Sequence, residues 1–148
     1  YDSWDDVPAV DIVIASRSME VKDMKFALEK LNQKANKRVY LTYKVGGSFL
    51  DDNILKALNK EIVKKPDYIY ILNILYQMGI TASVQFLKSE GRTSMYDDEG
   101  SFIQSVSWSL GELTENEILQ LKEYFHELRH EEKEKNKYVY WALISWEK

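Results

Sequence analysis

The chain has 148 residues, with 20 basic and 24 acidic side chains and a net charge of −4. A composition of 45% hydrophobic and 13% aromatic residues is typical of a folded globular protein and excludes a disordered binding tail. The absence of cysteine excludes disulfides, thiolate catalysis and cysteine-based zinc sites. No apolar run is long enough to span a bilayer, and basic residues are interleaved with acidic ones. We therefore expect a soluble, cytoplasmic protein that binds neither membranes nor nucleic acids.

The first third of the chain predicts an irregular arm followed by a strand, a helix and a second strand. Residues Tyr1 to Pro8 are acidic and irregular, and Val10 to Ala15 form a short β-branched run typical of a buried strand. Apolar residues from Val21 to Leu31 recur at helical spacing, with Ser18 as the expected N-cap. Between Arg38 and Val45 apolar and polar residues alternate, which predicts a half-buried strand.

The middle of the chain predicts two helices and two strands. The first helix lies within residues 48–62 and ends before Pro66, and a more buried helix runs from Tyr68 to Met78. Alternating apolar residues then predict a strand from Ile80 to Phe86 and another from Phe102 to Leu110. These two strands are expected to form a hairpin with a long polar loop.

The last third predicts one helix and one strand. Thr114 and Glu117 form a capping-box pattern at the start of a helix whose apolar stripe ends at Leu128. The final segment, Tyr138 to Trp146, is apolar on both alternating faces. It is therefore either a central strand or a strand with one face reserved for a partner. The second face would be covered by the arm, through Trp4, or left open.

Together these elements predict an α+β fold in one domain, residues 1–148, with residues 1–8 as the acidic arm. We expect a two-layer sandwich in which a mixed or antiparallel sheet of about five strands has helices mainly on one face. A single core is expected to contain seven residues: Ile71, Leu72, Leu75, Phe86, Val106, Phe125 and Leu128.

The string His126-Glu127-Leu128-Arg129-His130 resembles the H-E-x-x-H motif of the zincin metalloproteases over five residues. The resemblance implies zinc ligands at His126 and His130 and a general base at Glu127. The phase of the predicted helix places both histidines away from its apolar stripe, and the chain has no third histidine. We therefore expect both to be exposed, and we keep a zinc-dependent hydrolase as the alternative function.

Two other strings have a ligand-binding alternative beside a simpler interpretation. Gly46-Gly47-Ser48 lies between a predicted strand and a predicted helix, where backbone amides could hold a phosphate, although a turn followed by an N-cap also explains it. Asp97-Asp98-Glu99 could bind a hard cation, but it lacks the alternating spacing of an EF-hand loop, so a solvated hairpin tip is the favoured interpretation.

The functional hypothesis depends on the aromatic residues. Tyrosine and tryptophan are enriched at the centres of protein interfaces, and the alternative is that these rings belong to the core. With the acidic charge they favour a non-enzymatic protein-binding module, such as an immunity or inhibitor-type protein acting on a basic partner, with self-association as an alternative. No cofactor is expected. The candidate partner-binding residues are Trp4, Tyr140, Trp141 and Trp146.

Overall fold

The computed structural model describes residue 4 and residues 6–47, 50–91 and 93–148. The chain divides into two compact units. We call the first the sheet unit; it consists of Tyr1–Gly47, Pro66–Leu87 and Tyr140–Lys148. We call the second the helical unit; it consists of Ser48–Lys65 and Lys88–Val139. Within the described residues no helix is long and apolar enough to cross a membrane.

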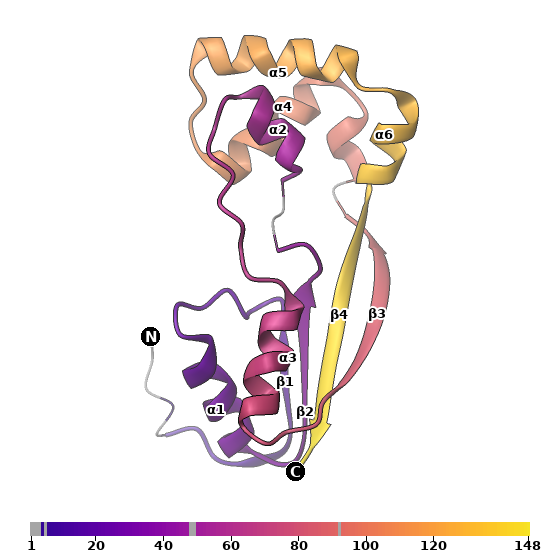
Figure 1. Ribbon diagram of the computed structural model, residues 1–148. Coiled ribbons are helices and arrows are strands. Elements are labelled where there is room, and N and C mark those ends of the chain that lie inside the picture. The colour runs from indigo at the N-terminus through magenta and orange to yellow at the C-terminus, as the bar shows by residue number, and fades with distance from the viewer. Residues whose placement is uncertain (1–3, 5, 48–49, 92) are drawn as a thin grey trace. The chain divides into compact units, whose positions relative to one another are not determined.

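The elements alternate between the two units along the chain (Figure 1). Strands β3 and β4 begin or end in the helical unit, so each contributes residues to both. The sheet unit contains β1 (Val10–Ser16), α1 (Met24–Lys34), β2 (Ala35–Lys44), α3 (Tyr68–Gln77), and most of β3 (Ser83–Glu90) and β4 (Tyr138–Glu147). The helical unit contains α2 (Asp52–Ala57), the 3-10 helix η1 (Thr93–Tyr96), α4 (Glu99–Leu110), α5 (Glu115–Glu127) and α6 (His130–Asn136).

The described strands form one mixed sheet of four strands in the order β1-β2-β4-β3. β1 pairs with β2 in parallel, β4 pairs with β2 in antiparallel, and Figure 1 shows β3 and β4 running in opposite directions. The predicted α+β class and mixed sheet are confirmed, with four strands instead of about five. The prediction that the final segment is a central strand is also confirmed, because β4 lies between β2 and β3.

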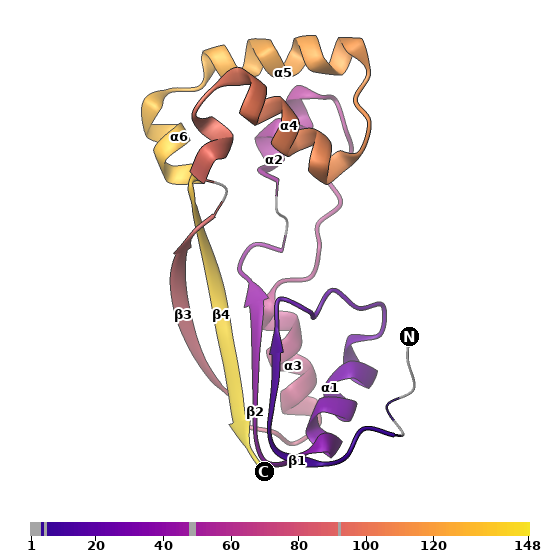
Figure 2. The ribbon, with the colours of Figure 1, turned by 180° about the vertical axis from the view of Figure 1, so that it is seen from behind.

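Both helices of the sheet unit lie on one face of the sheet (Figures 1 and 2). Leu28 and Leu31 of α1 and Ile71 and Leu75 of α3 are buried against that face. The strand residues in the same core are Ala15, Ala35, Val39, Leu41, Ala142, Ile144 and Trp146. No helix among the described residues of the sheet unit lies over the opposite face, and Ile12 and Ile14 are 53% and 71% exposed.

The predicted hairpin is wrong, because the segment expected to be its second strand is helix α4. Asp98 caps this helix: its Oδ1 accepts the backbone N–H of Ser101 at 2.9 Å and its Oδ2 accepts the Ser101 hydroxyl. These hydrogen bonds lower the pKa of Asp98. Phe102 and Val106, one turn apart, are fully buried. The acidic run at 97–99 is therefore the start of a helix and not a hairpin tip.

The expectation of one shared core is also wrong. Ile71 and Leu75 belong to the core of the sheet unit, with Leu72 packed against it, whereas Val106 and Phe125 belong to a second core in the helical unit, with Leu128 packed against that one. Phe86 is exposed beside Tyr68. Because β3 and β4 run through both units, the single domain 1–148 stays a prediction, now with two cores.

Helix boundaries differ in two further places. Helix α1 is capped by Asp23, whose Oδ1 accepts the backbone N–H of Phe26, and it starts later than the predicted Ser18. The last predicted helix is two helices, because Leu128 is extended at φ −62° and ψ 125°. Within it the predicted capping box of Thr114 and Glu117 is present.

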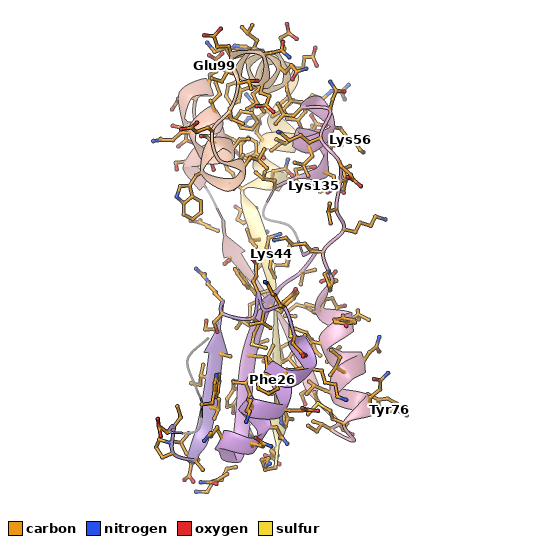
Figure 3. The ribbon with its side chains drawn as sticks, turned by 90° about the vertical axis from the view of Figure 1, so that its left-hand side faces the viewer. Phe26, Lys44, Lys56, Tyr76, Glu99 and Lys135 are labelled. Carbon is orange, nitrogen blue, oxygen red and sulfur yellow. The ribbon has the colours of Figure 1, made fainter. Side chains whose placement is uncertain are left out.

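Replacing Leu75 by Ala is expected to lower the free energy of unfolding by about 2–5 kcal/mol, because the side chain is fully buried between α3 and the sheet. Urea denaturation measures the change. The neighbouring Tyr76, 80% exposed and labelled in Figure 3, provides the control: Tyr76→Ala should change stability by less than about 0.5 kcal/mol. Equal losses in the two variants would contradict the core.

The raised pKa of the Tyr124 hydroxyl makes the stability of the helical unit depend on pH in the alkaline range. Burial, followed by the charge of Asp51, raises the pKa of this hydroxyl from 10.0 to about 12. Between these values the unfolded chain loses the proton first, so unfolding becomes more favourable as the pH rises. We expect the stability of Tyr124→Phe to fall less over this range than that of the parent chain. Unfolding curves measured across this pH range test it, and parallel declines would show that Tyr124 is not the group responsible.

Candidate ligand site at the carboxyl ends of the parallel strands

The two histidines of the zincin-like string are on different helices. His126 is in α5 and His130 starts α6, with the extended Leu128 between them. Both are exposed, as predicted, and the His126 side chain is 70% exposed. Its Nε2 lies 2.7 Å from Oε2 of Glu99, which is labelled in Figure 3. The expectation of one helix carrying both histidines is therefore wrong.

A metal site needs several ligands that converge. Nowhere in the described parts of the chain do three or more histidine, aspartate or glutamate side chains cluster in a way that could hold a metal ion. Glu127 ends α5 and is exposed. A zinc-dependent hydrolase remains a prediction, but His126 and His130 do not share the single helix from which that function was inferred.

The four candidate aromatic residues are dispersed in the sheet unit. Trp146 is 3% exposed, and its indole N–H donates to Oδ1 of Asn32 at 2.9 Å. Trp141 is 9% exposed, Tyr140 is exposed, and Trp4 packs against the core beside α1. Two of the four rings are thus buried, so the set does not form one continuous exposed patch. Trp4 lies on the helix side of the sheet and does not cover the face that carries Trp141.

The turn at Gly46 and Gly47 has the backbone that its sequence predicts, but its amides are occupied. Both residues have positive φ, at 82° and 69°. The N–H of Gly46 donates to Oδ1 of Asp67 at 3.1 Å, and the N–H of Gly47 donates to the carbonyl of Lys44. A phosphate here would compete with a carboxylate for the same donor. Ser48, the third member of the string, lies outside the described residues.

Parallel strands bring the loops that follow them to one edge of a sheet, where α/β proteins commonly bind ligands. Here the loop after β1 begins with Arg17, whose φ of 55° is rare for a residue with a side chain. The Arg17 N–H donates to Oγ1 of Thr42 at 3.1 Å, and its guanidinium lies 4.9 Å from the centre of the Trp141 ring. Contacts with β2 and β4 therefore hold this strained residue in place.

Acidic and phenolic groups gather at the same edge. Burial, then the charges of Glu20 and Asp67, raise the pKa of Tyr43. The Tyr43 hydroxyl donates to the carbonyl of Pro66 at 3.1 Å. Glu20 comes from the loop after β1, Tyr43 from the end of β2 and Asp67 from the N-cap of α3. Three separate segments thus contribute to the electrostatic environment of one partly buried hydroxyl.

A hollow of about 800 Å³ extends from this loop along β1. One wall is β1, at Val13 to Ala15, and another is α1, at Phe26 and its neighbours (Phe26 is labelled in Figure 3). Beyond the end of β1 the wall continues through Ser18 and Met19 and then Val21 to Asp23. Its volume is in the range of small-molecule sites, and its lining combines apolar walls with a few polar groups.

Sequence reasoning identifies Gly46 and Gly47 but misses Arg17, Glu20, Tyr43 and Asp67 as a group. The sequence marks Asp67 only as a helix cap, which it is. A left-handed arginine has no sequence signature, and the approach of the other three depends on the pairing of strands distant in sequence. The available signal is the position of Arg17 directly after a β-branched strand.

The comparisons with known proteins include a relative by sequence and a distant likeness in fold. No family model matches the sequence. An uncharacterized protein of Haemophilus influenzae is 41% identical over 152 residues, a match that covers 98% of this chain. The chain spans about half, 54%, of that protein's length. A phosphoethanolamine methyltransferase of Haemonchus contortus, solved with S-adenosylhomocysteine, is 12% identical with a TM-score of 0.45, covering 93% of this chain and 33% of the other. At that score the likeness carries no argument.

The strain at Arg17 is testable by a matched pair of substitutions. Arg17→Ala and Arg17→Gly both remove the guanidinium from Trp141, but only glycine adopts a φ of 55° without a steric cost. We therefore expect the glycine variant to be the more stable by about 1 kcal/mol in urea denaturation. An alanine variant of equal or greater stability would show that Arg17 is not held in the left-handed region.

Proposed function

We propose that this chain forms part of a small-molecule site at the carboxyl ends of β1 and β2, and that the ligand is of nucleoside type. The supporting observation is the left-handed Arg17 directly after β1, at the edge where parallel strands commonly bind ligands. The hollow between β1 and α1 opens beside the same loop. Strain of this kind is concentrated at binding and catalytic sites, and here two strands maintain it.

The chemistry of the edge favours a ligand that donates hydrogen bonds. Glu20 and Asp67 are acceptors, suited to the hydroxyls of a sugar or to an amine, and the apolar walls of the hollow suit a flat ring. Phosphate is disfavoured at the turn, because Gly46 already donates to Asp67, although Lys22 and Lys30 line the hollow. The proposed class is therefore a nucleoside and not a nucleotide.

A protein-binding function is the second candidate, and the exposed side chains of β1 favour it. Ile12 and Ile14 are apolar, and each is more than half exposed on the face without a helix. A basic partner, as an immunity or inhibitor-type protein would require, stays a prediction on the net charge of −4. Oligomeric state and cellular location stay predictions as well.

Titration of the chain with adenosine, S-adenosylhomocysteine, ATP and NAD, followed by amide chemical shifts, tests the ligand class. We expect the two compounds without phosphate to perturb the amides of residues 17–23 and ATP to bind more weakly. S-adenosylhomocysteine adds an ammonium group to the nucleoside, and that group suits the nearby carboxylates. Tighter binding of ATP, or no response from residues 17–23 to any compound, would contradict the proposal.

Two glutamates form a matched pair for the same titration. Glu20→Gln removes a charged acceptor in the loop that borders the hollow and should weaken binding by about tenfold, in line with about 1.5 kcal/mol for a hydrogen bond to a charged group. Glu29→Gln changes an exposed glutamate on α1 that pairs with Lys25 of the same helix at 3.9 Å, and it should leave binding unchanged. Equal effects would show that net charge, and not position, governs the affinity.

A further inference from the structure

We infer that the free edge of β1 and the sheet face beside it form an interaction surface for a β-α segment of polypeptide. A strand of that segment pairs in parallel with β1, and the helix that follows it covers Ile12 and Ile14. The inference does not rest on the proposed ligand, but the two share the hollow between β1 and α1. β1 lies at one end of the sheet order, with β2 as its one neighbour among the described strands.

The composition of β1 is that of an internal strand. Strands buried on both faces of parallel sheets are runs of β-branched residues, and β1 reads Val-Asp-Ile-Val-Ile-Ala-Ser. Natural edge strands are instead protected by lysine, proline or a covering element. The one charge in β1, Asp11, is paired with Lys37 of β2 at 2.6 Å. Nothing in the strand itself therefore discourages a further strand from pairing with it.

The helix side of the edge has room for such a segment. On the helix side, α1 extends beyond β1 and overhangs its free edge (Figure 2), and the hollow lies beneath that overhang. Val13 and Ala15 face it together with Phe26 and Leu31, so side chains of an added strand would find apolar contacts there. The part of the hollow beyond the end of β1, at Ser18 to Asp23, would remain for the ligand.

The overhang disfavours a second copy of the chain as the occupant. Two β1 edges related by a two-fold axis would pair in antiparallel and place both α1 helices on the same face, each over the other's edge. A parallel strand with its own helix on the opposite face avoids that collision and covers both faces, as parallel sheets require. The Haemophilus influenzae relative has enough additional chain to supply such a segment, because the match spans 54% of its length.

Co-expression tests the inference with a defined probe. The probe is the part of the Haemophilus influenzae protein that lies outside the match, produced as a separate polypeptide beside this chain carrying a purification tag. We expect a 1:1 complex in which the amides of Val10–Ser16 shift in NMR spectra. Absence of a complex, a complex that leaves β1 unperturbed, or a homodimer of this chain alone would each overturn the inference.

Two exposed apolar residues provide the matched variants. Ile14→Lys places a charge on the face that the added helix would cover and should weaken the complex at least tenfold, while its 71% exposure leaves the fold intact. Tyr76→Lys makes the same change at a residue of α3 that is 80% exposed and should have no effect. Equal effects of the two variants would overturn the inference. A complex that forms without any nucleoside response would support the interaction surface and reject the proposed ligand.

Discussion

The parallel pairing of β1 with β2 governs the arrangement of the sheet unit. Strand β1 supplies Val13 and Ala15 to the helix-covered side and Ile12 and Ile14 to the other side, so it is apolar on both. α1 covers the first side and connects the strand to β2 through a parallel crossover. That crossover in turn brings the loop after β1 to the same edge as the end of β2, where Arg17 reaches Thr42. The strain at Arg17 is thus a consequence of how β1 is held.

The helical unit is held by different contacts and has its own core. The ring centre of Phe102 lies 5.4 Å from that of Phe125 and 5.7 Å from that of Tyr96, and Asn136 donates to Asp51 at 3.1 Å. These contacts join α4, α5 and η1, and they link α6 to the start of α2. The exposed His126 and His130 lie on this unit without converging, so its structure is explained by aromatic packing and helix caps.

A feature formed by residues close together in the sequence can be predicted from it. The choice between helix and strand for a short apolar pattern cannot. The Thr114 and Glu117 capping box is recognisable because its two partners are three residues apart. Helix α4 resembles a strand in sequence because Phe102, Val106 and Leu110 are spaced by four, which fits both a strand period of 2 and a helical turn. Trp108 distinguishes the two: on a strand it would share their face, and on the helix it is 83% exposed.

The candidate site is beyond the reach of sequence reasoning for a different reason. Arg17 reaches Thr42 only through the pairing of β1 with β2, and Tyr43 approaches Asp67 only because α3 begins beside the end of β2. Each of these residues has an ordinary local explanation: a residue after a strand, a residue near the end of a strand and a helix cap. Their shared location therefore follows from tertiary structure and not from any spacing along the chain.

Amide hydrogen exchange along β1 in the isolated chain tests most directly whether the strand has an uncovered edge. Neighbouring residues of a strand direct their backbone groups to opposite sides, so a strand with one partner should protect only every second amide. We predict alternating protection from Val10 to Ser16 and continuous protection along Leu41 to Tyr43 of β2, which is paired on both sides. Continuous protection along β1 would mean that its edge is already covered and would refute the proposed interaction surface.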